Sequence, residues 1–188
     1  MINIIGGKFK RKKIEVPKKE VRPTSAIKRE AIFSILESYA FDNSFDLYSN
    51  KCFIDLFAGS GSLGLEAISR GASFSYFYEL NNNVIKILQK NCEAICKKKE
   101  FKIFQKDSML IKSFDLDFLT SVIFIDPPYK YLFFERILNN LEESKIIAKN
   151  TIIVIESDKK NILEFSSNFK IINNKTYGKT KLYFLKKL

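Results

Sequence analysis

Residues 51–64 carry the pattern from which the fold class can be predicted, and they read Lys51-Cys52-Phe53-Ile54-Asp55-Leu56-Phe57-Ala58-Gly59-Ser60-Gly61-Ser62-Leu63-Gly64. The apolar beginning predicts a buried strand, and the apolar spacing that continues to about Arg70 predicts a helix. Between them, Gly59, Gly61 and Gly64 match G-x-G-x-x-G, the loop that binds nucleoside-bearing cofactors between a strand and a helix. The pattern therefore indicates an α/β fold with parallel strands.

The carboxylates near this loop favour S-adenosylmethionine over NAD. Asp55 ends the predicted strand beside the glycines, where its charge would repel a pyrophosphate and attract a sulfonium or ammonium group. Glu79 lies 24 residues further on, at the end of the next predicted strand, where a carboxylate can accept hydrogen bonds from ribose hydroxyls. A chain of 188 residues is also short for two mononucleotide-binding halves and a substrate domain.

Strand and helix patterns alternate through the rest of the chain, which predicts a mostly parallel sheet with helices on both faces. The predicted strands span 51–56, 73–79, 101–105, 122–125, 151–156, 169–176 and 181–186, and the last two form a hairpin around Gly178. The predicted helices span 26–39, from the glycine loop to about 70, 82–99 and 133–143, with short helices within 109–119 and 161–165. Thr24 or Ser25 can cap the first helix.

A second functional pattern, Asp126-Pro127-Pro128-Tyr129, follows the apolar strand at 122–125. Two prolines make a stiff loop, because proline fixes φ and has no N–H to donate to a sheet. Asp126 and the Pro127 carbonyl can each accept one hydrogen of an exocyclic amine, and Tyr129 can stack on a flat heterocycle. Taken alone, the motif would more often be a strand ending in a turn with a core tyrosine. The glycine loop upstream makes a base-binding corner the better interpretation.

Composition limits the remaining chemistry. The net charge of +11 and the pI near 9.5 favour a nucleic-acid partner, although an AT-rich genome could also enrich lysine. Histidine is absent, which excludes histidine bases and ligands, and the three cysteines do not form a CxxC pair, so we expect no metal. We find no signal-peptide pattern and no apolar run of transmembrane length. We expect a cytoplasmic protein, monomeric and independent of membranes.

The N-terminal residues predict a basic hairpin. Apolar residues within 2–16 flank Gly6-Gly7, a hairpin signal. The second arm concentrates charge of one sign around Phe9, at positions Lys8, Lys10, Arg11, Lys12 and Lys13. An edge strand protected by lysine would show the same composition. The concentration of charge favours an arm that grips RNA phosphates, with Phe9 available to stack on a base.

The sequence resembles the RsmD family, the guanine-N2 methyltransferases of small-subunit ribosomal RNA. The resemblance spans nearly the whole chain and rests on residues 55–61, Leu63-Gly64-Leu65-Glu66-Ala67, Glu79, Asp126-Pro127-Pro128-Tyr129, Gly6-Gly7, Arg22-Pro23-Thr24 with Arg29-Glu30, and Tyr177-Gly178-Lys179-Thr180. It implies a class I Rossmann-like methyltransferase fold with a seven-stranded, mostly parallel sheet over residues 26–188, preceded by a basic hairpin arm at 1–25. It also implies S-adenosylmethionine as methyl donor and, as partner, small-subunit ribosomal RNA or its ribonucleoprotein particle.

The resemblance assigns roles to individual positions. The methionine part of the cofactor would be lined by Asp55, Phe57, Ala58, Gly59 and Gly61. Glu79 would hold the ribose, and Asp107 with Ser108 would lie near the adenine. Asp126, Pro127 and Tyr129 would take the target base. Thr24 and Arg22 would close over the cofactor tail, and Arg22 is also a candidate RNA contact with the basic arm.

Three other functions remain open at this point. The Asp-Pro-Pro-Tyr motif also serves adenine-N6 methyltransferases of DNA or RNA, although a sequence-specific DNA enzyme would need a recognition domain that this chain lacks. A non-catalytic RNA-binding assembly factor could keep the same fold, but it would have no need of Asp126, Glu79 and the glycines. A small NAD-dependent oxidoreductase is disfavoured by the charge of Asp55.

Overall fold

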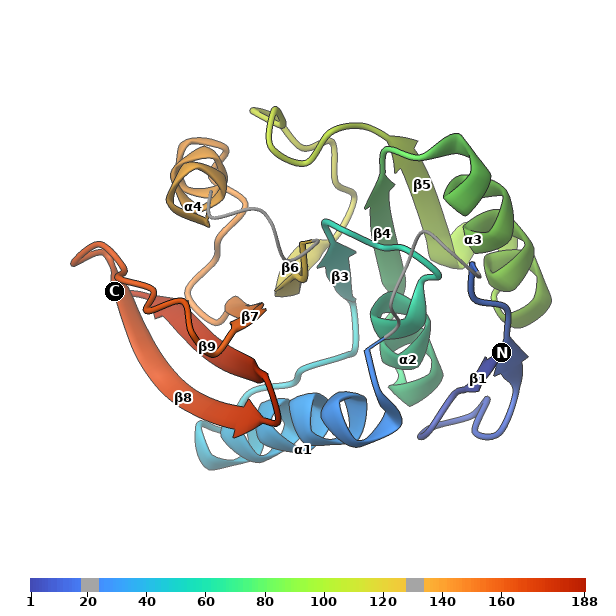
Figure 1. The fold of residues 1–188 in the computed structure, drawn as a ribbon, viewed down its shortest axis with the longest axis horizontal. Coiled ribbons are helices and arrows are strands. Elements are labelled where there is room, and N and C mark those ends of the chain that lie inside the picture. Colours follow the sequence, from blue (N-terminus) through green and yellow to red (C-terminus); the bar gives the residue numbers. More distant parts are fainter. Residues whose placement is uncertain (18–23, 128–133) are drawn as a thin grey trace.

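The computed structural model describes residues 1–17, 24–127 and 134–188 of the chain. Within these residues, seven strands form one sheet in the order β5-β4-β3-β6-β7-β9-β8 (Figure 1). Five of them are parallel, namely β3 (Lys51–Asp55), β4 (Phe74–Glu79), β5 (Phe101–Gln105), β6 (Leu119–Ile125) and β7 (Ile152–Asp158). The antiparallel hairpin of β8 (Phe169–Tyr177) and β9 (Thr180–Lys187) closes one edge by pairing β9 with β7. The predicted seven-stranded, mostly parallel sheet is confirmed.

The strand order reverses at the middle of the sheet, where β3 lies between β4 and β6. The chain runs outward from β3 through β4 to β5, and then returns to place β6 on the other side of β3. Loops that leave β3 and β6 therefore diverge, and open α/β sheets bind ligands in the crevice that such a reversal creates at the carboxyl ends of the strands.

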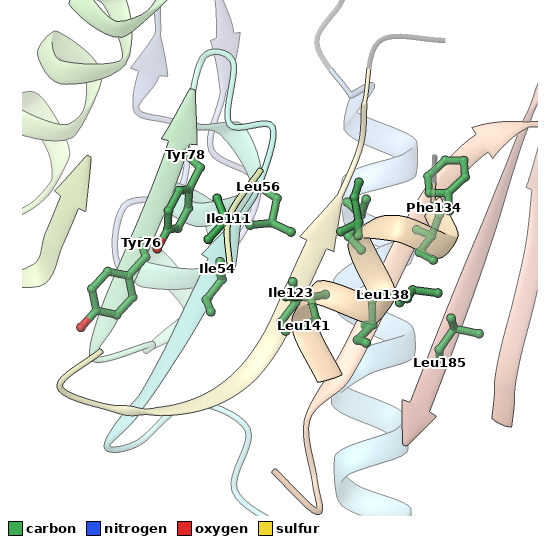
Figure 2. Close-up of a cluster of buried hydrophobic side chains, with 14 of the residues drawn as sticks. Ile54, Leu56, Tyr76, Tyr78, Ile111, Ile123, Phe134, Leu138, Leu141 and Leu185 are labelled. Carbon is green, nitrogen blue, oxygen red and sulfur yellow. The ribbon is translucent and has the colours of Figure 1, made fainter. Parts of the chain in front are cut away.

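Helices cover both faces of the sheet, as predicted. On one face lie α1 (Ala26–Asp42), α2 (Ser62–Arg70) and α3 (Asn82–Ile95), whose apolar residues pack with Phe53, Phe77 and Phe124. On the other face lies α4 (Phe134–Glu143), whose apolar side chains belong to the same buried cluster as Ile54 and Ile123 (Figure 2). Because both faces are buried, the central strands are almost continuously apolar. None of the described helices has the length and apolar character needed to span a bilayer.

The two short helices predicted at 109–119 and 161–165 are wrong, since the structure has no helix there. Phe114, Leu116 and Phe118 pack against the sheet at alternate positions, which is the spacing of extended chain. The Asp117 N–H donates to the Tyr76 hydroxyl at 2.8 Å and holds this segment on the sheet before β6 begins. In the second segment, Phe165 makes an edge-on ring contact with Tyr183, so tertiary packing determines its conformation.

Two helices differ from prediction in their ends. Helix α1 begins after Ser25, whose hydroxyl caps it, and continues past residue 39 to Asp42 because Ala40 is buried against the sheet. Helix α3 stops at Ile95, four residues before the predicted end, and a single 3₁₀ turn, η1 (Lys98–Glu100), leads into β5.

The N-terminal hairpin is present but has very short strands, β1 (Ile2–Asn3) and β2 (Lys13–Ile14). The basic segment between them forms turns, so only Lys13–Ile14 of the predicted second arm is a strand. Its backbone finds hydrogen-bond partners on α2, where Lys8 N donates to the Ser69 carbonyl at 2.7 Å and Phe9 N to the Ser69 hydroxyl at 2.9 Å. The hairpin is thus fixed to the carboxyl end of α2. The division of the chain at residue 25 stays a prediction.

Candidate active site

Four neighbouring strands of the sheet present a carboxylate at their carboxyl ends. The four residues are Asp55 on β3, Glu79 on β4, Asp126 directly after β6, and Glu156 on β7. Each lies two positions beyond a residue that packs under α1–α3, namely Phe53, Phe77, Phe124 or Val154. Because side chains alternate along a strand, all four carboxylates belong to the same face of the sheet. They gather on the side where α1 and α2 begin.

A cavity of about 450 Å³ lies at this edge and brings most of the predicted site together. Of the predicted residues it is lined by Thr24, Asp55, Phe57, Ala58, Gly59, Glu79, Asp107, Ser108, Asp126 and Pro127. Gly61 does not line the cavity, and the role at the methionine part of the cofactor that the resemblance implies for it stays a prediction. Tyr129 and Arg22 lie outside the described residues.

The glycine loop takes its shape from contacts with β4 and α3. Ala58 N donates to the Tyr78 carbonyl at 3.0 Å, and Gly59 N donates to Glu79 Oε2 at 3.0 Å. Gly61 precedes α2 with a φ of 82°, a conformation that side chains disfavour, and an added Cβ would lie 2.6 Å from Leu88. Gly61 therefore serves the strand-to-helix turn, which explains its absence from the cavity wall.

Asp55 offers an unsatisfied acceptor to a ligand in the cavity. It is 2% exposed, and its Oδ1 has no hydrogen-bond partner among the described residues. Burial raises the pKa of Asp55 to about 7, the backbone N–H groups of Gly64 and Phe57 oppose that rise, and the charge of Glu79 adds to it. A buried carboxylate oxygen without a partner is costly unless a cation or donor meets it, so this position fits the ammonium or sulfonium of a cofactor.

The next two acids are held by backbone donors. Glu79 Oε1 accepts from Leu80 N and Asn81 N at 2.9 Å, which fixes the carboxylate where ribose hydroxyls could share its remaining lone pairs. Asp107 accepts from Met109 N at 2.9 Å. The Ser108 hydroxyl instead donates to the Leu56 carbonyl, so it joins the loop after β5 to the end of β3.

Asp126 is half-buried and stands between a hydroxyl and a second carboxylate. Its Oδ2 accepts from the Thr24 hydroxyl at 3.0 Å. Burial and the neighbouring Glu156 raise the pKa of Asp126 to about 8, while the Lys28 ammonium and the Thr24 hydrogen bond act in the opposite direction. Thr24 therefore contacts the predicted base-binding corner, and the contact with the cofactor tail that the resemblance implies stays a prediction.

Lys28 and Glu156 are site residues that sequence reasoning missed. The Lys28 ammonium, on the first turns of α1, forms an ion pair with Glu156 Oε1, and both side chains line the cavity. A signal for Glu156 existed, because it ends an apolar strand as Asp55 and Glu79 do. Lys28 gave no such signal, since a lysine on a helix is normally a solvated residue.

The charge of the cavity is opposite to that of the protein. Five carboxylates line it, Asp55, Glu79, Asp107, Asp126 and Glu156, against two ammonium groups, Lys28 and Lys106. The whole chain carries +11. Within the described residues, no three of these acids converge closely enough to hold a metal ion. An organic cation such as S-adenosylmethionine fits carboxylates spread along a cavity wall.

The predicted RNA-binding residues of the hairpin are all exposed, at Lys8, Lys10, Arg11, Lys12 and Lys13. Phe9 is half-buried against the core, and the ammoniums of Lys8 and Lys12 lie 4.9 Å from its ring centre. The ring therefore packs on the protein. The basic turn lies at the carboxyl end of α2, and the cavity at its amino end, about 13 Å away for nine helical residues.

Comparison with known proteins gives a consistent group of relatives. The sequence profile of a family described as Conserved hypothetical protein 95 matches residues 2–186. Ribosomal RNA small subunit methyltransferase D of Buchnera aphidicola (subsp. Acyrthosiphon pisum) is 34% identical over 97% of this chain and 91% of its own. The protein of the same name from Haemophilus influenzae is 31% identical over 94% of this chain and 89% of its own length. Among solved structures, yhhF of Escherichia coli matches with a TM-score of 0.81 and 27% identity, over 99% of this chain and 97% of that chain.

Proposed function

The chain belongs to the conserved hypothetical protein 95 family, the RsmD family of methyltransferases, and on this basis we propose that it transfers a methyl group from S-adenosylmethionine to the exocyclic N2 amine of one guanine in small-subunit ribosomal RNA. The observation that supports this most directly is the position of Asp126. It shares one cavity with the glycine loop and with the unsatisfied Asp55 carboxylate. A methyl acceptor at Asp126 and a cationic donor at Asp55 would therefore meet.

The residues of the glycine loop fit the proposed donor. Asp55 Oδ1 would accept from its ammonium, Glu79 would hold its ribose hydroxyls, and Asp107 would lie near its adenine. When bound, S-adenosylmethionine supplies a methyl group on a positively charged sulfur, which is a good leaving group. The protein would then have to align the guanine amine with this methyl group, and alignment alone can contribute much of the rate of methyl transfer.

Asp126 and the Pro127 carbonyl would prepare the acceptor amine. The N2 lone pair of guanine is delocalised into the ring, which makes the amine a poor nucleophile. If each of the two acceptors takes one N–H, the nitrogen turns toward tetrahedral geometry and its lone pair points at the methyl group. Positive charge then grows on the nitrogen beside the Asp126 carboxylate, a gain specific to the transition state. The released proton leaves to water.

The base must leave its stack to enter this corner, which costs a few kcal/mol. Stacking on Tyr129 would offset about 1–3 kcal/mol of that cost. The exposed cations of the hairpin would hold the RNA phosphates while the base is extruded. The family resemblance and the basic hairpin are the grounds for these proposed RNA contacts.

The direct test incubates the protein with methyl-labelled S-adenosylmethionine and small-subunit particles that lack the modification, and then analyses the nucleosides. N2-methylguanosine is the expected product. Labelled N6-methyladenosine would assign the chain to the adenine-N6 enzymes. Tight particle binding without any label would favour a non-catalytic assembly factor.

A further inference from the structure

The Lys28–Glu156 ion pair lies directly beside Asp126. Strands β6 and β7 pair in parallel register with Ile125 opposite Ile155, so Asp126 and Glu156 are the next neighbours across the two strands. Both side chains face α1, from which Lys28 reaches Glu156. All three groups line the cavity, and the Glu156 carboxylate neighbours both the Asp126 carboxylate and the Lys28 ammonium.

This order is complementary to one edge of guanine. From the N2 amine, the edge presents an N2–H donor, an N1–H donor and the O6 acceptor. The wall presents an acceptor, an acceptor and a donor. We propose that Glu156 accepts the N1–H and Lys28 donates to O6 while Asp126 holds the N2 amine, so that this pair selects guanine as the acceptor base. The inference rests on the proposed function and assigns its base specificity to two residues.

Adenine would meet the same wall with two mismatches. With its N6 amine at Asp126, adenine turns the lone pair of N1 toward Glu156 and a C2–H toward Lys28. A lone pair facing a carboxylate is repulsive, and the ammonium would lose its acceptor. A site built around buried polar groups rejects a ligand that leaves them unpaired.

The Lys28–Glu156 ion pair keeps both charges compensated before a base binds. Glu156 is 5% exposed and the Lys28 side chain 13%, so each neutralises the other in a largely dry position. An ammonium has three donors and a carboxylate about four acceptor positions, so both can add a base contact without giving up their existing partners. Ring insertion would therefore not require a buried charge to stand alone.

The test changes both residues together, because removing one would leave the other charged and buried. Lys28→Met with Glu156→Gln keeps the volume of the wall and removes its charges. Methyl transfer to guanine-containing particles should fall roughly 100-fold or more, about 10- to 100-fold for each charge-assisted hydrogen bond. The affinity for S-adenosylmethionine, measured by calorimetry, should change by less than about threefold, since neither residue is assigned to the cofactor.

A base analogue separates recognition from folding. Particles are reconstituted with 2-aminopurine at the nucleotide methylated in the assay above. This analogue keeps the 2-amino group and lacks both N1–H and O6. Wild-type protein should methylate guanine at least about 100-fold faster than 2-aminopurine, and the double variant should treat the two bases alike within about threefold.

The matched control is Glu142→Gln with Lys187→Met, which removes an ion pair of the same residue types, 3.3 Å long, away from the cavity. It should retain the wild-type preference for guanine. If the Lys28/Glu156 double variant slows both bases by the same factor, the pair has only a structural role and the inference is overturned. A wild-type protein that makes no N2-methylguanosine overturns the proposed function itself, whatever the variants do.

Discussion

Asp126 combines two properties that rarely occur together, a fixed position and a proton affinity near neutrality. Thr24 holds its Oδ2 at 3.0 Å, and burial with Glu156 sets its pKa to about 8. Burial and the charge of Glu156 therefore favour the protonated form of this carboxyl group in the free protein. Positive charge that develops on an amine beside Asp126 lowers that pKa, and the carboxylate then acts as a full acceptor.

Binding of S-adenosylmethionine should release protons and tighten as pH rises. Asp55, with a pKa of about 7 and an Oδ1 that has no partner among the described residues, holds a proton in the free protein below that pH. A bound cation favours the charged Asp55 carboxylate, so affinity should increase by up to about tenfold per pH unit below pH 7 and level off above it. Calorimetry in buffers of different ionisation enthalpy counts the protons. An affinity independent of pH between 6 and 8 would contradict the prediction.

Replacement of Asp126 should separate catalysis from cofactor binding. Asp126→Asn keeps an acceptor but loses the charge that opposes the developing positive nitrogen, and we expect a loss of about 10²- to 10³-fold in the rate of methyl transfer. Asp126→Ala should abolish turnover. Cofactor affinity by calorimetry should stay nearly intact in both variants. Asp115→Asn is the control, because that carboxylate is 92% exposed and pairs only at 3.6 Å with Lys102. Near-normal turnover of Asp126→Ala would refute the mechanism.

The position of helix α2 depends on a close contact between the Gly64 backbone and the Phe77 ring of β4. A Cβ added to Gly64 would lie 2.3 Å from the Phe77 ring of β4, so the helix can pack at its observed depth only with glycine there. The same contact sets the position of the loop that begins the helix. Burial of the helix and the geometry of the glycine loop therefore depend on one position.

Gly64→Ala should destabilise the fold by about 1–3 kcal/mol, because overpacking forces the ring or the helix to move. Thermal or urea unfolding measures the loss. In a Phe77→Leu background the added methyl group finds more room, so the cost of Gly64→Ala should shrink, and a double-mutant cycle measures the difference. Equal costs in both backgrounds would show that the ring contact does not limit the helix position.

The hairpin is an element whose conformation is imposed by its neighbour. Glu66 of α2 is fully buried and accepts hydrogen bonds from Ile5 N at 2.8 Å and Gly6 N at 2.7 Å. Arg70 donates to the same carboxylate at 3.0 Å, so the charge is compensated. These bonds and those of Ser69 take the place of strand pairing, which is why the basic segment turns and presents its cations to solvent.

Charge is distributed unequally over the whole molecule, with an acidic cavity in a protein of +11. The cavity suits a cation and the basic hairpin suits a polyanion, and the two lie at opposite ends of α2. Under the proposed function, the methyl donor and the RNA would therefore bind to separate charged surfaces. Long-range attraction of RNA by the surface should depend steeply on salt.

Replacing Lys10, Arg11, Lys12 and Lys13 by Ala should weaken RNA binding and flatten its salt dependence. The slope of log affinity against log salt should decrease by roughly 0.7–0.9 for each RNA phosphate that the variant no longer neutralises. The control replaces the same number of exposed cationic residues elsewhere, the lysines Lys145, Lys149, Lys159 and Lys160. Equal effects of the two sets would mean that net charge, and not the hairpin, binds the RNA.

Much of the fold could be predicted from the sequence because its signals are local. The apolar runs at 51–55 and 122–125 are strands, and the glycines between Ala58 and Leu65 end one element and begin another. The rule that ligands bind beyond the carboxyl ends of parallel strands then grouped Asp55, Glu79 and Asp126. The structure brings these three to one cavity. Errors occurred where local spacing was ambiguous, as at Phe114, Leu116 and Phe118, which alternate along an extended segment.

Interactions between distant parts of the chain could not be derived in this way. Thr24 meets Asp126 across 102 positions and Lys28 meets Glu156 across 128, because α1 crosses the face on which those strands end. No spacing in the sequence encodes such pairs. The order of amino acids was enough to establish the glycine loop and the acidic residues at the strand ends. It also established the alternation that places those acidic residues on one face of the sheet, since all of these features depend on neighbouring residues. The assembled fold was required to place an ammonium beside Glu156 and a hydroxyl on Asp126, since only packing of helix on sheet brings them within hydrogen-bond distance.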